Sequence, residues 1–104
     1  MAVTPPFKIV WSPKSLKTFD KIIDYLKENF TDKEIKHFIQ KVTRILTHIS
    51  YNPSMFKSSA MRKNIFLVVV SKQTTLYYRF KTSRQQVELL IFWDNRQNPK
   101  KLKY

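Results

Sequence analysis

Val87-Glu-Leu-Leu-Ile-Phe-Trp93 is the stretch that decides the fold, because it predicts a buried strand that runs directly into a basic tail, residues 94–104. The tail carries several cations and a single acid: Arg96, Lys100, Lys101 and Lys103 against Asp94. We therefore expect the rest of the chain to act as a scaffold, and the tail to be the place where an anionic partner binds.

Two more strands are predicted just upstream. Residues 65–70, Ile-Phe-Leu-Val-Val-Val, are β-branched and apolar enough to predict a central strand. Residues 75–80 return after a short turn, and a second turn leads into residues 87–93, so that the three strands form a meander. Alternate side chains of the middle strand must face opposite sides of the sheet, and a one-residue register step would exchange them. The two sets are Leu76, Tyr78 and Phe80 on one side, and Tyr77 and Arg79 on the other.

The N-terminal half predicts a short strand followed by two amphipathic helices. Residues 7–11 alternate enough to predict a short strand with Phe7, Ile9 and Trp11 on one face, and Ser12-Pro13 supplies an N-cap and a first helical residue. Apolar residues then recur every three or four positions up to Phe30. Thr31-Asp-Lys-Glu34 is a capping box that starts a second helix, which ends before Asn52-Pro53.

The element order β-α-α-β-β-β predicts an α+β fold, in which a helical hairpin packs on one face of a small, mainly antiparallel sheet. A length of 104 residues predicts a single domain spanning 1–104. Because two helices cannot cover both faces of the sheet, we expect the other face to be partly open, concave and basic. Such a face would be a binding surface.

Charge is the strongest signal in the composition. The net charge is +13, and it is uneven, since residues 57–104 hold eleven Lys and Arg against two acids. Self-repulsion at this charge would be relieved by a nucleic acid, a ribosome or an acidic protein. The second helix adds a basic stripe that could meet phosphate or an acidic partner, made of Lys33, His37, Lys41, Arg44 and His48.

The residue types that the chain lacks exclude several classes of enzyme. With no glycine, the chain has no Gly-rich phosphate loop, which excludes P-loop and dinucleotide-binding enzymes and the hydrolases with a glycine-flanked serine. The positive φ angles must fall on other residues, and the candidates are Asn29, Asn52, Asn64, Asp94 and Asn95. His37 and His48 are too far apart for a helical metal pair, so we expect no metal site and no cofactor.

The absence of cysteine, of a membrane-length apolar run and of a signal-peptide pattern in Met1 to Phe7 suggests a soluble, cytoplasmic protein. We therefore expect no contact with a membrane.

Two motifs and the order of the elements around them resemble a known family. Leu76-Tyr-Tyr-Arg-Phe80 and Ile91-Phe-Trp-Asp-Asn-Arg-Gln-Asn-Pro-Lys-Lys-Leu102 follow a Ser-Pro-started helix, a second helix and a basic loop. This arrangement resembles the RelE/ParE toxins of type II toxin-antitoxin modules over nearly the whole chain, and it is most similar to the ParE-type subgroup. The resemblance implies growth inhibition, a basic groove on the sheet and a cognate acidic antitoxin, with no small-molecule substrate.

Two activities divide that family. RelE-type toxins cut messenger RNA in the ribosome by activating a ribose 2′-OH, and ParE-type toxins poison DNA gyrase. Arg96 matches the position of a phosphate-binding arginine of the nuclease branch. However, Thr75 lies near where that branch commonly has an arginine, and Leu102 stands where it has a tyrosine. The resemblance therefore favours the gyrase-directed branch, with the ribosome-dependent endoribonuclease as the alternative.

The resemblance and the charge pattern together select the candidate site residues. If the protein cuts RNA, we expect Arg96, Arg79 and Lys63 to bind the phosphate and Tyr104 to move the proton. For binding of a target or an antitoxin, the candidates are Lys57, Arg62, Lys63, Tyr77, Arg79, Arg96, Lys100 and Lys101.

Simpler roles remain open for three of the residues near this surface. Arg79 could pair with Glu88 across the hairpin, Trp93 could belong to the core, and Asp94 could cap the end of its strand. A third class of function is a nucleic-acid-binding domain without toxicity.

Overall fold

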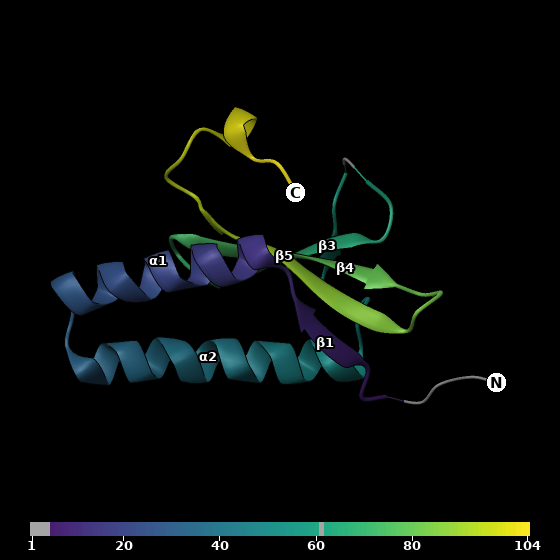
Figure 1. Ribbon diagram of the computed structural model, residues 1–104, viewed down its shortest axis with the longest axis horizontal. Helices are drawn as coiled ribbons and strands as arrows, with labels where there is room; N and C mark the ends of the chain where they lie inside the picture. The colour runs from purple at the N-terminus through teal and green to yellow at the C-terminus, as the bar shows by residue number, and fades with distance from the viewer. Residues whose placement is uncertain (1–4, 61) are drawn as a thin grey trace.

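Two helices packed side by side cover one face of a mixed sheet in the computed structural model, which describes residues 5–60 and 62–104 (Figure 1). The elements, in chain order, are β1 Lys8–Trp11, α1 Pro13–Asn29, α2 Asp32–Tyr51, β2 Lys57–Ser58, β3 Ile65–Ser71, β4 Thr74–Lys81, β5 Gln86–Asp94 and the short 3₁₀ turn η1 Pro99–Lys101. The predicted α+β fold with a helical hairpin on one sheet face is thus confirmed.

The strand order is β1-β5-β4-β3-β2, with β1 parallel to β5 and the other pairs antiparallel. One detail differs from the sequence prediction, because the loop expected over residues 53–63 contains the two-residue edge strand β2. β3 pairs with β2 on one side and with β4 on the other, so the prediction of an interior strand is confirmed.

The helix starts follow the predicted caps. The Ser12 hydroxyl accepts a hydrogen bond from the Ser15 amide at 3.0 Å, and the Thr31 hydroxyl accepts one from the Glu34 amide at 3.4 Å. Pro13 is the first residue of α1, and Asn52 caps the end of α2. Both helices are therefore bounded by local side-chain chemistry.

The core lies between the helical hairpin and the sheet. Leu76 and Tyr78 of β4 are fully buried on this side, which settles which set of alternate side chains faces the helices. The Tyr78 hydroxyl donates to the Pro53 carbonyl at 2.6 Å, and burial raises the pKa of this phenol. Trp11, Phe19 and Phe92 pack together with ring centroids 5.2 to 5.5 Å apart.

The outer face of the sheet, defined as the face turned away from the helices, carries Tyr77 and Arg79. It is less open than predicted, since Ile65 and Trp93 on this face are only 1% and 8% exposed. The tail and the loop that precedes β3 rise from the sheet on the side away from α2 (Figure 1). These segments supply cover that the sequence patterns did not predict, and Trp93 is a core residue.

Positive φ angles occur at Asn64 (61°) and Gln85 (53°) among the described residues. Asn64 was one of the predicted candidates, whereas Asn29, Asn52, Asp94 and Asn95 do not adopt this conformation. Gln85 takes the second position because it ends the turn between β4 and β5.

In the described ranges, no helix is long and apolar enough to cross a membrane. The predicted absence of a signal peptide concerns a segment that lies partly outside the described residues.

Candidate binding surfaces on the two sides of the sheet

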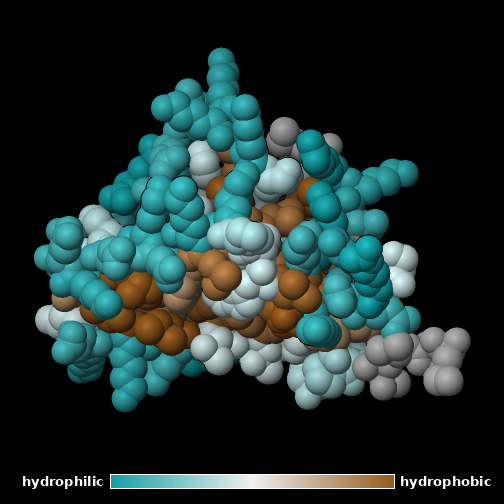
Figure 2. Space-filling model, in the orientation of Figure 1, coloured by the Kyte–Doolittle hydropathy of each residue, from teal (hydrophilic) through white to brown (hydrophobic). Residues whose placement is uncertain are grey.

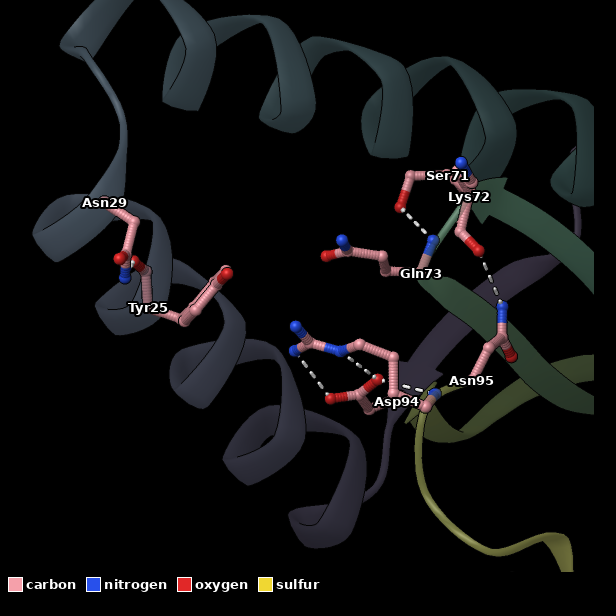
Figure 3. Close-up of polar contacts among 8 residues, drawn as sticks. Tyr25, Asn29, Ser71, Lys72, Gln73, Asp94 and Asn95 are labelled. Atoms are coloured by element: carbon pink, nitrogen blue, oxygen red, sulfur yellow. Dashed lines mark hydrogen bonds and ion pairs between the residues drawn. The ribbon is translucent and has the colours of Figure 1, made fainter.

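Arg96 is held at the exit of β5 by Asp94 and Tyr25. Its Nε and Nη2 atoms donate to the two carboxylate oxygens of Asp94 at 3.0 and 2.9 Å, and its backbone amide donates to Oδ1 at 2.9 Å. The guanidinium carbon lies 5.2 Å from the centre of the Tyr25 ring on α1. Figure 3 shows Asp94 and Tyr25 on opposite sides of one space between β5 and α1. Arg96 therefore links the strand exit to the helical hairpin.

The pKa of the Asp94 carboxyl is held below its ordinary value, chiefly by the side-chain hydrogen bonds from Arg96. The carboxylate accepts the Arg96 amide at the end of β5, which confirms the prediction that Asp94 caps its strand. It also orients the Arg96 guanidinium.

Asn95 fixes the turn between β3 and β4 against the start of the tail (Figure 3). Its amide donates to the Gln73 carbonyl at 2.8 Å, and its side chain accepts from the Thr75 hydroxyl at 2.8 Å and donates to the Lys72 carbonyl at 3.4 Å. The sequence did not predict this role, because the partners are about twenty residues away. The turn and the start of the tail thus form one wall of the space beside Arg96.

A cleft of about 1020 Å³ opens between this wall and the helical hairpin. Its floor is apolar, and Figure 2 shows an apolar band between the two helices with hydrophilic side chains on either side of it. The apolar lining is Ile22, Tyr25, Leu26, Phe30, Phe38, Ile91, Phe92 and Trp93. The charged and titratable lining is Lys21, Lys33, Lys41, Lys72, Arg96, His37, Glu34 and Asp94.

Part of the basic stripe predicted on α2 contributes to the cleft. Lys33, His37 and Lys41 line it, whereas Arg44 and His48 lie further along the helix, outside the lining. Tyr25 and Phe30 line the cleft but were not among the predicted site residues. A signal was present, since Phe30 ends the apolar stripe of α1 beyond the point where the sheet can cover it, and it is 42% exposed.

The outer face carries a second, separate group of contacts. The rings of Tyr77 and Tyr104 stack with centroids 5.0 Å apart and planes 28° apart, and the Tyr104 hydroxyl lies 2.9 Å from the Ser59 hydroxyl. Burial, and then the neighbouring Tyr104 phenol, raise the pKa of Tyr77. Lys14 Nζ donates to the Lys103 carbonyl at 2.8 Å, so the tail folds back over the sheet.

Arg79 pairs with Glu88 at 3.8 Å across β4 and β5, and Lys81 approaches the same carboxylate at 3.4 Å. The first of these ion pairs confirms the prediction that Arg79 pairs with Glu88 across the hairpin. Both pairs are partly exposed, so each contributes less than about 1 kcal/mol to stability. Arg79 therefore retains freedom to contact a ligand.

The structure divides the candidate catalytic residues between two places. Arg79 and Tyr104 belong to the outer face, whereas the contacts that the described residues make with Arg96 come from Asp94 and Tyr25. Lys57 lies on β2 opposite Leu67, which places it at the rim of the outer face. The other candidates are exposed, namely Arg62, Lys63, Lys100 and Lys101.

Comparison with known proteins places this fold. No protein-family model matches the chain, and no curated protein matches it in sequence. Solved structures do match. The chromosomal ParDE toxin-antitoxin system from P. aeruginosa aligns with a TM-score of 0.69 at 10% identity, covering 86% of this chain and 96% of the matched chain.

Two further matches agree. The RelBE2 toxin-antitoxin complex from Mycobacterium tuberculosis aligns with a TM-score of 0.60 at 12% identity, over 92% of this chain and 98% of the other. The YoeB/ParE toxin from Agrobacterium tumefaciens aligns with a TM-score of 0.59 at 15% identity, over 85% and 98%. The chain therefore has the RelE/ParE toxin fold.

Proposed function

We propose that this protein is the toxin of a type II toxin-antitoxin module, that it inhibits bacterial growth by acting on DNA gyrase, and that an acidic antitoxin neutralises it. One observation supports the toxin part of the proposal: the fold matches 86% of this chain and 96% of the aligned chain of a ParDE system. The choice of gyrase as the target rests on the motifs that resemble ParE-type toxins. The proposal gives the +13 chain an acidic partner that relieves its self-repulsion.

The placement of Arg96 supports a binding role over nuclease chemistry. Stabilising a phosphorane requires cations aimed at one developing charge, and proton transfer requires a group within hydrogen-bond reach of the same centre. Arg96 instead pairs with Asp94 and contacts α1, while the Tyr104 hydroxyl pairs with Ser59. The ribosome-dependent messenger RNA endoribonuclease is the second candidate, because Arg79 and Tyr104 do share the outer face.

The cleft beside α1 and α2 has the chemistry to receive the antitoxin. Its apolar floor would take the hydrophobic side of an amphipathic segment, and the rim cations Lys33, Lys41 and Lys72 would meet its acidic side. An acidic, amphipathic segment would thus fill the cleft and reduce the net charge of the complex.

The deciding experiment is induction of the protein in growing bacteria, with two readouts from the same culture. We expect growth arrest, accumulation of gyrase–DNA cleavage complexes, and no new ribosome-dependent cuts in messenger RNA. The matched control is the same transcript with a stop codon at Lys8. New cuts without gyrase complexes would select the endoribonuclease, and unchanged growth at full expression would reject a toxin and leave a nucleic-acid-binding domain.

A further inference from the structure

The wall of the cleft carries hydrogen-bond donors beside the apolar floor. Gln73, in the turn between β3 and β4, extends its side chain toward the helical hairpin, and Tyr25 faces it from α1 (Figure 3). None of the described residues makes a hydrogen bond to the Gln73 side-chain amide. Arg96 gives its Nε and Nη2 donors to Asp94, which leaves the Nη1 amino group available. The wall therefore offers an amide and a guanidinium to a ligand.

The rim of the cleft adds further positive charge. Four lysines line the same space: Lys21, Lys33, Lys41 and Lys72. None of them forms an ion pair with a described residue. Of the two acids in the lining, Asp94 is held by Arg96, and Glu34 belongs to the capping box of α2. The cleft thus has an excess of cations, which favours an anionic ligand.

The floor of the cleft fits hydrocarbon better than an added strand. Tyr25 and Phe30 stand at its edge, 37% and 42% exposed, with ring centroids 6.1 Å apart. β5 pairs with β4 as far as Asp94, and on its other side the Phe92 amide is already bonded to the Thr18 hydroxyl of α1 at 3.0 Å. Because α1 occupies this side of β5, an extended peptide cannot pair there, and its backbone would lie unpaired on apolar side chains.

Together these features define the chemistry of the ligand. Sites for small organic molecules are concave and mostly apolar, hold about 300–1,000 Å³ and have a few convergent polar groups. This cleft, at about 1020 Å³, lies at the upper end of that range. Its floor requires an alkyl or aryl body without polar groups, and its wall and rim require a negatively charged head group.

We propose that the cleft binds a small amphipathic anion, an organic acid whose alkyl or aryl body lies on the apolar floor and whose head group is held by Gln73 and Arg96. The ligand comes from solution, because the floor has hydrophilic side chains on either side (Figure 2) and a flat membrane surface cannot reach it. The inference goes beyond the proposed function and does not rest on it. The ligand is bound and not converted, and it would exclude a partner segment from the same cleft.

Two contributions set the expected pattern of affinity. Burial of one methylene group tightens binding about fourfold, so affinity should rise with the length of the alkyl chain. A hydrogen bond between a charged donor and a carboxylate tightens binding about tenfold. An alcohol of the same chain length lacks the charge and should bind about tenfold more weakly.

The test is a nuclear magnetic resonance titration of the full chain with sodium hexanoate, octanoate and decanoate as probes. We expect the resonances of the Gln73 side-chain amide and of Arg96 Nε to shift, which locates the head group. The dissociation constant should fall about fourfold for each added methylene group. Octanol is the uncharged counterpart of octanoate and should bind about tenfold more weakly.

Substitutions test the two ends of the ligand separately. Arg96→Gln should weaken octanoate binding about tenfold and Gln73→Ala about fivefold, whereas Arg84→Gln, in the exposed turn before β5, should change nothing. Phe30→Ala should weaken decanoate binding about fivefold through lost apolar contact. Its matched control is Tyr51→Ala, an exposed aromatic residue at the end of α2, outside the cleft. Circular dichroism checks that each variant is folded.

Three results would overturn the proposal. Octanol that binds as tightly as octanoate would show that the wall does not hold a charged head group. Arg96→Gln and Gln73→Ala that bind octanoate like Arg84→Gln would place the anion elsewhere on the +13 surface. Binding to phosphatidylglycerol vesicles without binding of monomeric decanoate would assign the floor to a lipid surface. Because the readout is binding by the purified chain, failure here leaves the growth and gyrase experiment unaffected.

Discussion

Arg96 has one partner at the end of β5 and one on α1, and both contacts use its planar guanidinium. Asp94 receives two parallel hydrogen bonds from it, and the Tyr25 ring lies under it. Lysine could not reproduce this pair of contacts, since an ammonium group lacks the flat, forked geometry. Arg96 is also 53% exposed in its side chain, so it can contact a partner without moving the core.

We predict that Arg96→Ala abolishes growth inhibition while the protein stays folded. The guanidinium is on the surface, so its loss removes a binding group and the link to Tyr25 but leaves no cavity. Growth after induction gives the first readout, and thermal unfolding of the purified variant gives the second. Arg84→Ala, at an exposed arginine in the turn before β5, is the control that should remain toxic. Retained toxicity of Arg96→Ala at normal expression would remove Arg96 from the functional surface.

Each helix is tied into the fold at its N-terminus, but the two caps differ. Ser12 caps α1 and also joins it to β5, because its amide donates to the Leu89 carbonyl and its hydroxyl to the Leu90 carbonyl, both at 3.2 Å. Thr31 makes the local contacts of its capping box with Glu34 in an exposed turn. The first cap therefore stabilises a helix–sheet contact and the second only a helix.

We predict that Ser12→Ala destabilises the protein by about 1–2 kcal/mol and Thr31→Ala by about 0.5–1 kcal/mol. The difference arises because removal of the Ser12 hydroxyl also leaves the Leu90 carbonyl without that donor. Urea unfolding followed by circular dichroism measures both changes. An equal or larger loss for Thr31→Ala would show that the bond from Ser12 to β5 contributes nothing.

The whole molecule has a charge of +13, and the described residues form few ion pairs to offset it. The ion pairs among the described residues are Arg79 and Lys81 with Glu88, and Arg96 with Asp94. Most cations therefore repel one another across a domain whose Cα radius of gyration is 14.0 Å. At 0.1 M salt the screening length is about 10 Å, so this repulsion acts across much of the domain.

We predict that the melting temperature rises by a few degrees between about 0.02 and 0.5 M sodium chloride, because salt screens the repulsion more than it weakens three partly exposed pairs. Calorimetry at fixed pH measures the shift, and chloride is chosen because sulfate would stabilise by exclusion from the surface. A flat or falling melting temperature would mean that attraction between charges already balances repulsion. Substituting Lys100 and Lys101 by Gln should reduce the salt effect.

What the sequence determined by itself is local. Caps at Ser12 and Thr31, the two helical stripes, the alternation in β4 and the positive φ at Asn64 depend on neighbours within a few positions, so a pattern can reveal them. The positive φ angle at Gln85 was not predicted, because in a turn without glycine any of several residue types can adopt the left-handed conformation.

What the tertiary structure alone decided is which distant side chains meet. The β4–β5 register shifts between Tyr77 and Tyr78. This irregularity changes which residues of β5 pair with β4, and therefore which of them share a face with a given residue of β4. The same kind of long-range geometry turns Arg96 toward Tyr25 and lays Tyr104 on Tyr77. These contacts span 71 and 27 positions of the chain, and a helical or strand periodicity does not extend that far. The residues of the two surfaces are therefore brought together only by the packing of the helical hairpin and the return of the tail.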